Sequence, residues 1–302
     1  MKNLTIKQLR YFEALALHCH FGRAAEACSI SQPALSLQIK ELEETLNVTL
    51  FERGRRLVRL TAFGEEFSIR VHEILRSIDA LGDLARGSQS WLEGTLRMGI
   101  IPTIAPYLLP AIIRNLSQTY PKLDLQMRET QTQKLIQELN EGRLDSAILA
   151  LPVSEPSLVE TKLFEEEFVL VRSSADEGKP IPKRDKLREM KLLLLEEGHC
   201  FRDQALSFCN VGVASPKEML EGSSLSTLVQ MVGAGIGITL IPEMAVSVET
   251  RSAPVSIARF GMPKPTRAIG MIWRKTSPLS KQLIQISDLV RQSAHAMQHN
   301  SK

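Results

Sequence analysis

Residues 21–60 read FGRAAEACSISQPALSLQIKELEETLNVTLFERGRRLVRL, and this stretch decides the fold of the N-terminal part of the chain. Residues 21–28 predict a short helix. Ser31 suits the N-cap of the helix that follows it, and Pro33 in the first turn of that helix costs no hydrogen bond. An amphipathic helix over residues 4–17 precedes the pair. Two helices joined by a turn of about three residues predict a helix-turn-helix. The later helix, Gln32–Leu46, turns these apolar residues inward: Ala34, Leu35, Ile39, Leu42 and Leu46.

A run of basic residues follows these helices. Residues 50–61 alternate apolar and basic side chains, which predicts a small β-hairpin wing along a phosphate backbone. A solvated charged turn is the alternative interpretation. The first 62 residues hold nine Lys or Arg against six Glu, a net charge of +3, while the 28 basic and 28 acidic residues of the remainder balance. We therefore predict that the N-terminal segment binds double-stranded DNA. The predicted contact residues are Gln32, Pro33, Ala34, Ser36, Gln38, Lys40, Arg53, Arg55 and Arg56.

The next segment has a heptad pattern. Between residues 65 and 85, apolar residues recur at steps of three and four with charged residues between them. Such a stripe predicts a helix that pairs with a second helix, and residues 87–90 then look like a hinge. The alternative is a single amphipathic helix that packs on its own domain, because only three heptads are present. The predicted dimerisation residues are Phe67, Val71, Ile74, Ile78 and Leu81.

From Gly94 onward, strand-like and helix-like segments alternate, which predicts a mostly parallel α/β architecture. Gly233, Gly235 and Gly237 follow a helix rather than a strand, so they predict a helix end and a tight turn instead of a dinucleotide-binding loop. Strands are expected at residues 96–101, 123–128, 144–151, 168–172, 191–195, 238–241 and 268–273, and helices at 106–116, 132–140 and 277–296.

The composition is that of a globular protein with more than one domain. Of 302 residues, 43% are hydrophobic and 24% are charged, which argues against disorder. Neither a cleavable leader nor an apolar run of about 18 residues occurs, so we expect a cytoplasmic protein without a membrane partner. The four cysteines then leave reduced thiols, a metal site or redox chemistry as choices. Cys19 and Cys28 match no zinc pattern despite the nearby His18 and His20, so we expect buried structural thiols, no metal and no cofactor.

The other two cysteines bound the segment Cys200–Cys209, which follows an apolar run at residues 192–195 that reads as a buried strand. If the segment is one helix, nine steps of roughly 1.5 Å separate the two Cα atoms by about 13.5 Å and leave the thiols on opposite sides. A disulfide needs Cα atoms within about 7 Å, so the pair bonds only if the segment unwinds. The segment predicts either a redox switch or two inert structural thiols.

Several short motifs occur in order in the N-terminal part, namely Ala24–Ala25, Ser31–Ser36, Ile39–Glu43 and Leu50–Arg53. With these motifs, residues 21–67 closely resemble the winged helix-turn-helix of LysR-type transcriptional regulators. The resemblance implies a homodimer, or a tetramer, that acts on a promoter operator and contacts RNA polymerase. It also implies three parts: a winged helix-turn-helix at 1–62, a dimerising linker helix and hinge at 63–90, and a two-lobed α/β regulatory domain of periplasmic-binding-protein type at 91–302.

A further set of residues, including 198–205 with Cys209, 101–110 and 131–132, resembles the members of this family that sense hydrogen peroxide. The resemblance implies that Cys200 is oxidised to a sulfenic acid and that Cys209 resolves it to a disulfide, which a dithiol reductant reverses. A peroxide-reactive cysteine must be a thiolate, and a helix start and a nearby cation favour that form. The implied peroxide site consists of Thr103, Thr132, His199, Arg202, Asp203 and Arg267.

Other functions remain open. A LysR-type regulator of a small organic metabolite would carry an inert Cys200, and peroxide would leave its thiol count unchanged. A thiol peroxidase would need continuous turnover with a reductant and would give the helix-turn-helix no purpose, so we do not expect an enzyme. Ser146 takes a strand position where some peroxide-sensing relatives have another cysteine, which leaves the Cys200–Cys209 mechanism untouched.

Overall fold

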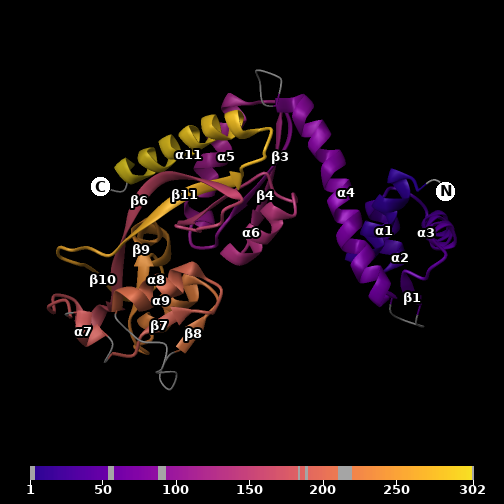
Figure 1. Cartoon of the computed structure of the whole chain (residues 1–302). Helices are drawn as coiled ribbons and strands as arrows, with labels where there is room; N and C mark the ends of the chain where they lie inside the picture. The colour runs from indigo at the N-terminus through magenta and orange to yellow at the C-terminus, as the bar shows by residue number, and fades with distance from the viewer. Residues whose placement is uncertain are drawn as a thin grey trace. The chain divides into compact units, whose positions relative to one another are not determined.

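The computed structural model describes residues 4–53, 58–87, 93–182, 184–187, 190–209 and 220–300. The chain divides into two compact units, Met1–Ala85 and Arg86–Lys302, whose elements are labelled in Figure 1. Within the described ranges, no helix is long and apolar enough to cross a membrane.

The N-terminal unit begins with the helices α1 (Ile6–His18), α2 (Phe21–Ala27) and α3 (Gln32–Leu46). Side chains cap their first turns, which stabilises each helix start. The hydroxyl of Thr5 accepts from the backbone N of Gln8 at 3.2 Å, and that of Ser31 accepts from the backbone N of Ala34 at 3.3 Å. Because α3 has the predicted bounds and packs with α2, the helix-turn-helix prediction is confirmed.

The predicted wing is a hairpin of β1 (Phe51–Arg53) and β2 (Val58–Leu60), paired antiparallel. Glu43 of α3 fixes where the hairpin begins. Its Oε1 accepts from the backbone N of Leu50 at 2.8 Å and from that of Phe51 at 3.1 Å. Arg55 and Arg56, two of the predicted DNA contacts, lie outside the described residues.

The long helix α4 (Ala62–Gly87) uses part of its apolar stripe inside its own unit. Val71 is 1% exposed within the core of the three-helix domain, and Phe67 and Ile78 pack against that core. The ring of Phe67 meets that of Phe12 edge-on at 5.0 Å. Phe67, Val71 and Ile78 therefore cover the core of their own domain, and their part in dimerisation stays a prediction.

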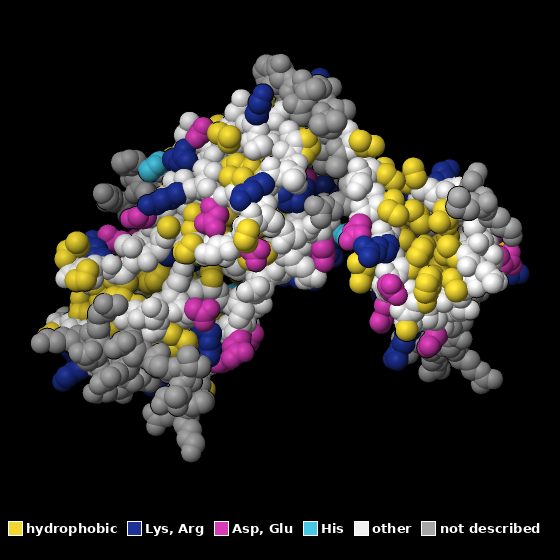
Figure 2. Space-filling model, in the orientation of Figure 1, with side chains coloured by type: hydrophobic (Ala, Val, Ile, Leu, Met, Phe, Trp, Pro, Cys, Tyr) yellow, Lys and Arg dark blue, Asp and Glu magenta, His cyan; other side chains and the backbone are white. Residues whose placement is uncertain are grey.

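Other apolar residues of α4 stay open to solvent. Ile74 is 48% exposed and Leu81 is 67% exposed, and both belong to the predicted dimerisation set. Phe63 and Ile69, which that set did not include, are also exposed. Figure 2 shows hydrophobic side chains gathered on one face of the N-terminal unit. Dimerisation through the exposed residues of α4 stays a prediction.

The second unit alternates strands and helices. Its strands are β3 (Gly94–Ile100), β4 (Leu123–Glu129), β5 (Ser146–Leu151), β6 (Leu158–Ser173), β7 (Leu193–Leu195), β8 (Leu220–Gly222), β9 (Thr239–Pro242), β10 (Val255–Arg259) and β11 (Thr266–Arg274). Its helices are α5 (Ala105–Thr119), α6 (Thr132–Asn140), α7 (Arg184–Leu187), α8 (Cys200–Cys209), α9 (Leu225–Gly233), α10 (Val246–Glu249) and α11 (Ser280–Asn300). As predicted, the glycines after α9 form a helix end and turn, in which Gly235 has φ +79°.

The main sheet is mixed, so the prediction of a mostly parallel sheet is wrong. In the described part of the chain, its strand order is β10-β6-β11-β5-β3-β4, with β9 also paired to β6. Only β3 pairs in parallel there, with β4 and β5. Strand β11 returns from far along the chain and lies antiparallel between β5 and β6, a pairing that a local pattern does not reveal.

Two hydrophobic cores define two lobes, as predicted for a two-lobed α/β unit. The first core gathers residues of β3, β4, β5, α5, α6 and α11, and the second gathers residues of β7, β9, α8 and α9. Strand β6 serves both, because Leu163 and Phe164 lie in the first core and Phe168 and Val169 lie in the second. Figure 1 shows β6 and β11 running together from one lobe to the other. These continuous strands join the lobes.

Candidate functional site

Helix α8 carries both candidate redox cysteines, one at each end. It spans Cys200–Cys209 without a break, as predicted, and neither cysteine takes part in a disulfide. A helix of this length holds the two Cα atoms about 13.5 Å apart, roughly twice the limit for a disulfide. In this form of the protein the pair therefore cannot bond unless α8 unwinds.

The two cysteines of α8 pack against the cores of different lobes. Cys209 is fully buried in the core of the second lobe. Cys200 is partly buried and packs against the core of the first lobe, although its helix belongs to the second. Cys200 therefore lies where the two lobes meet, and a change at this residue bears on the contact between them.

The first lobe also contacts the loop that leads into Cys200. Gln131, just before α6, donates from Nε2 to the backbone oxygen of Glu197 at 3.2 Å. Gly198 has φ +92°, and a β-carbon there would lie 2.4 Å from Oε1 of Gln131. A side chain at Gly198 is thus disfavoured both by the backbone conformation and by space. Gln131 was not among the predicted site residues, although its place beside Thr132 hinted at it.

Arg267 supplies a buried positive charge beside the start of α8. Its guanidinium donates to Glu166 Oε2 at 2.9 Å and to the hydroxyl of Thr103 at 2.8 Å, and a further bond reaches the backbone oxygen of Thr103 at 3.1 Å. Its Cζ lies 5.3 Å from the ring centroid of Phe201, the residue after Cys200. The structure therefore brings two predicted site residues, Thr103 and Arg267, into direct contact beside the start of α8.

The carboxylate partner of Arg267 was missed in the sequence. Glu166 and Arg267 face each other across β6 and β11, and both side chains are almost completely buried. Burial raises the pKa of Glu166, while the charge of Arg267 opposes that rise. The sequence has three glutamates in a row at residues 165–167, so no local pattern singles out Glu166. In the structure it faces inward while Glu165 and Glu167 are more exposed, as the alternation of faces along a strand requires.

Arg202 has hydrogen bonds that the sequence did not reveal. Its Nη1 donates to the backbone oxygen of Leu195 at 2.9 Å and to Glu221 Oε1 at 2.6 Å. These bonds tie α8 to the ends of β7 and β8. Arg202 is therefore an anchor of the helix in this structure, and its role as a cation for the Cys200 thiol stays a prediction. Asp203, also predicted in the site, is exposed on the outer surface of α8.

His199 and Thr132 complete the predicted site. His199 is 9% exposed, and burial lowers its pKa, although the charge of Glu196 partly opposes that effect. A neutral imidazole at neutral pH follows. Thr132 is the first residue of α6, and its hydroxyl oxygen is buried with no hydrogen-bond partner among the described residues. Both groups can therefore take part in binding a small polar molecule.

Helix α3 presents much of the predicted DNA-contacting set to solvent. Gln32, Pro33 and Lys40 are exposed, and Ser36 and Gln38 are partly so. Ala34 is also exposed, so the prediction that it faces inward is wrong. An exposed Ala34 can contact DNA, as the predicted contact set requires. Lys40 forms a loose ion pair, 3.7 Å from Glu44. Arg53 lies in β1 of the wing.

Comparison with known protein families decides what kind of chain this is. Residues 6–65 match the family described as bacterial regulatory helix-turn-helix protein, lysR family, and residues 90–295 match the LysR substrate binding domain. The chain belongs to the LysR family of transcriptional regulators. Members of this family join a DNA-binding unit to a regulatory unit, in the order found here.

The relatives within the LysR family are similar over nearly the whole chain. A probable hydrogen peroxide-inducible genes activator from Streptomyces viridosporus is 44% identical, covering 96% of this chain and 94% of that protein. Full-length OxyR from Pseudomonas aeruginosa, solved as a variant, has 35% identity and a TM-score of 0.75, with 96% of each chain covered. A hydrogen peroxide-bound OxyR mutant from Corynebacterium glutamicum has 33% identity and a TM-score of 0.68, covering 99% of this chain and 95% of that one.

The cysteines of the LysR-type DNA-binding unit depart from the sequence-based expectation. Cys19 follows the end of α1 with φ 48° and is exposed, so the prediction that it is buried is wrong. Cys28 follows α2 and is partly buried, and burial raises the pKa of its thiol. Both cysteines terminate helices rather than pack within them, which explains their exposure.

Proposed function

We propose that this LysR-family chain is a sequence-specific, DNA-binding transcriptional regulator that senses hydrogen peroxide through Cys200 and Cys209. One observation carries the proposal: α8 holds two reduced thiols at its opposite ends, so a bond between them and an intact helix exclude each other. The names of the relatives support the signal, because they are hydrogen peroxide-inducible activators and OxyR proteins.

The chemistry consumes one peroxide and both thiols. The thiolate of Cys200 attacks one peroxide oxygen, the O–O bond breaks, and the leaving hydroxide takes a proton to become water. The sulfenic acid formed at Cys200 is then attacked by the thiolate of Cys209, which forms the S–S bond and releases a second water. Two electrons pass from the thiols to the peroxide. A dithiol reductant later restores both thiols by thiol–disulfide exchange, in which the reductant is itself oxidised to a disulfide.

The residues around Cys200 are suited to the attack of its thiolate on hydrogen peroxide. The positive end of α8 lies at Cys200, and a helix N-terminus stabilises a thiolate. The hydroxyl of Thr132 and the neutral ring of His199 are suited to hold the peroxide oxygens as donor and acceptor. Thr103, whose hydroxyl accepts from Arg267, offers its own proton to the same peroxide. In this proposal Arg202 and Asp203 act only through the position of α8.

Unwinding of α8 transmits the signal. Because Cys200 packs on the first lobe and Cys209 in the second, drawing them together changes how the lobes meet. We propose that the regulatory units of a homodimer, or of a tetramer, pass this change to DNA-binding units on a promoter and to RNA polymerase. The exposed residues Ile74 and Leu81 of α4 support pairing through that helix. A cytoplasmic location fits this function.

We expect Lys40→Ala to weaken DNA binding through the loss of one phosphate contact. The logarithm of the binding constant should then fall less steeply with the logarithm of salt concentration, by a slope of about 0.9. Fluorescence anisotropy with duplex DNA over a salt series measures this slope. Lys122→Ala is the matched control, because Lys122 is an exposed lysine of the regulatory unit with its own carboxylate partner, Glu93, at 2.9 Å. An unchanged slope in Lys40→Ala would remove Lys40 from the interface.

A footprint on DNA tests the proposed function as a whole. Duplexes are selected from a random pool with the reduced protein, and the protected bases are then mapped before and after a peroxide pulse. We expect the pattern to change on oxidation, to revert with a dithiol, and to stay constant in Cys200→Ser. A pattern that ignores peroxide in the wild type would reject the redox signal and favour a LysR-type metabolite sensor.

A further inference from the structure

A buried tyrosine joins the two lobes of the regulatory unit. Tyr107 lies in the first turn of α5, a helix of the first lobe, yet its side chain packs in the core of the second lobe. Its hydroxyl donates to Oε1 of Glu249, at the end of α10, at 2.7 Å. The helix residues Ala105, Leu108 and Ile112 stay in the first core. Tyr107 therefore ties the start of α5 to the second lobe.

The carboxylate of Glu249 is held from two sides. Glu249 is 9% exposed, and the hydroxyl of Ser226 in α9 donates to its Oε2 at 2.5 Å. Burial raises the pKa of Tyr107, and the hydrogen bond and the charge of Glu249 raise that pKa further. The phenol therefore keeps its proton at neutral pH and remains a donor. A buried hydrogen bond to a charged acceptor is among the stronger hydrogen bonds of a protein.

The position of Tyr107 is the counterpart of that of Cys200. Cys200 begins a helix of the second lobe and packs against the first core, so each lobe places one residue against the core of the other. Arg267 lies between the two places. It donates to the hydroxyl of Thr103, four residues before Tyr107, and it lies against the ring of Phe201, next to Cys200. A change in how the lobes meet at Cys200 therefore reaches Tyr107 through a few contacts.

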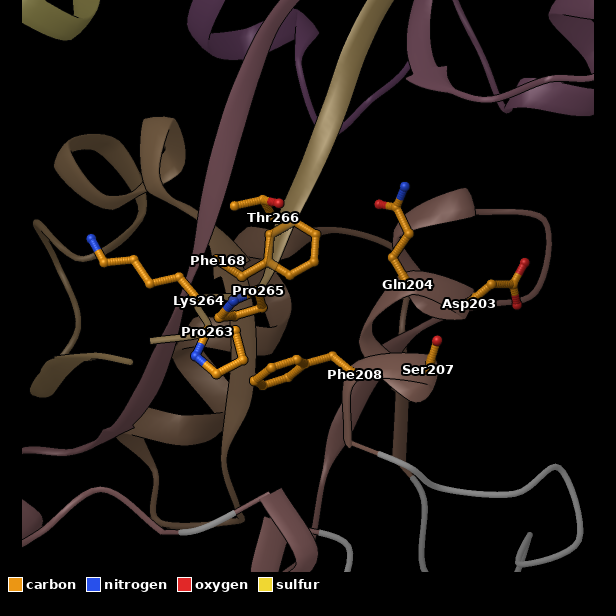
Figure 3. Close-up of a pocket in the computed structure, with 9 residues that line it drawn as sticks. All are labelled: Phe168, Asp203, Gln204, Ser207, Phe208, Pro263, Lys264, Pro265 and Thr266. Atoms are coloured by element: carbon orange, nitrogen blue, oxygen red, sulfur yellow. The ribbon is translucent and has the colours of Figure 1, made fainter. Parts of the chain in front are cut away.

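A disulfide between the two cysteines of α8 requires a large local movement. Their Cα atoms lie about 13.5 Å apart in the intact helix and must come within about 7 Å. Cys209 is fully buried in the second core, so we expect Cys200 to move, away from the first lobe. Figure 3 shows α8 on one side of a surface hollow of about 530 Å³ and, on the other, β6 with the segment that leads into β11. This hollow leaves room beside α8 for the segment to unwind.

We propose that Tyr107 is a positioning residue for the redox switch: its bond to Glu249 holds the lobes as they meet in the reduced form, and formation of the Cys200–Cys209 disulfide breaks that bond. The proposal rests on the proposed redox function. Because a hydrogen bond of 2.7 Å is lost when its atoms move about 1 Å further apart, a small shift between the lobes is enough to break it. The bond then opposes oxidation, and its strength sets how readily the disulfide forms.

A redox titration of the full chain against glutathione tests the effect of Tyr107. Each protein disulfide formed consumes one glutathione disulfide and yields two glutathiones, which defines an equilibrium constant for disulfide formation. We expect this constant to rise about 10-fold in Tyr107→Phe, because the ring stays and only the hydrogen bond is removed. For a two-electron couple, that factor corresponds to a reduction potential about 30 mV more negative.

Tyr120→Phe is the matched control for this titration. Tyr120 directly follows the other end of α5 and packs against the first core. Its hydroxyl lies 3.5 Å from Oε1 of Gln285 in α11, so this contact does not join the lobes. The equilibrium constant of Tyr120→Phe should equal that of the wild type.

Variants of Glu249 show whether Tyr107 acts through this bond. Glu249→Leu should raise the constant about as much as Tyr107→Phe, and the double variant should raise it no further. Glu249→Gln keeps an acceptor for the phenol, so its constant should lie closer to that of the wild type.

Two results would overturn the role of Tyr107. An unchanged constant in Tyr107→Phe would mean that the bond stabilises the reduced and oxidised forms equally, as a merely structural contact does. Additive effects of Tyr107→Phe and Glu249→Leu would mean that the two residues act separately. If the wild type itself forms no Cys200–Cys209 bridge in the titration, the proposed redox function fails, and this proposal fails with it.

Discussion

The Cys200→Ser variant is expected to form no disulfide after a hydrogen peroxide pulse, and its peroxide-driven loss of thiols should slow by at least about 100-fold. Only Cys200 combines a helix N-terminus with partial exposure, and reactivity with peroxide follows thiolate character and access. Cys209 is fully buried while α8 is intact, so it should not react first. Stopped-flow mixing with peroxide and timed alkylation of the remaining thiols measure the rate.

A variant of the second cysteine separates the oxidation of Cys200 from the formation of the disulfide. Cys209→Ala should still be oxidised at Cys200 but should stop there, so a sulfenic acid accumulates that dimedone traps. Cys19→Ser and Cys28→Ser are the controls, since these thiols belong to the N-terminal unit and should leave both steps unchanged. A Cys200→Ser protein that loses thiols as fast as the wild type would assign the reaction to another cysteine.

Replacing Arg267 by Met should destabilise the regulatory unit by about 3–5 kcal/mol, because it leaves the buried carboxylate of Glu166 without its ion pair. Urea unfolding of the two proteins at pH 7 measures the difference. The double variant Arg267→Met, Glu166→Gln should recover much of the loss, since no buried charge then remains. Arg259→Met is the matched control. Its pair with Glu243 is largely exposed, so about 0–1 kcal/mol is expected.

The pH dependence of the stability lost in Arg267→Met gives a second readout. Burial raises the pKa of Glu166 and Arg267 opposes that rise, so in Arg267→Met the folded state holds this proton more tightly still. The contribution of a raised carboxyl pKa to stability is full below the unfolded-state value and is lost as pH rises through the folded-state value. The defect of Arg267→Met should therefore be smallest in acid and grow towards neutral pH. A defect that is equal at all pH values would mean lost packing rather than an unpaired charge.

Local signals allowed much of the fold to be predicted. The bounds of α3 and α6 match the expected ranges, because a Ser N-cap with Pro in the first turn marks one and apolar spacing marks the other. Local spacing also predicts the continuous helix between Cys200 and Cys209, and this helix is what keeps the two thiols apart. These features are set by residues a few positions apart.

Long-range pairing was beyond the reach of the sequence pattern. Only residues 168–172 of β6 were expected as a strand, because charged residues interrupt its first part. In the structure that part pairs with β11, which also produces the mixed sheet. The apolar stripe of α4 was ambiguous for the same reason, since helical spacing does not say whether Val71 faces its own domain or a second chain.

At the candidate site, too, local residues could be predicted and their long-range partners could not. The sequence placed two arginines near Cys200, but it could not say which carboxylate each one meets. Arg202 turns to Glu221 and anchors α8, whereas Arg267 pairs with Glu166 and reaches Thr103. Both pairings join residues from separate elements, so only the folded chain defines them. The pairing of Arg267 could have been suspected, because a buried strand arginine needs a buried acid.

Disulfide mapping by mass spectrometry tests the central claim most directly. The full-length reduced chain receives a brief, near-stoichiometric pulse of hydrogen peroxide, and its four cysteines are then assigned as free or bridged. Our account predicts a Cys200–Cys209 bridge that a dithiol reverses. Four free thiols after the pulse would contradict it and would make α8 a structural helix with two inert cysteines.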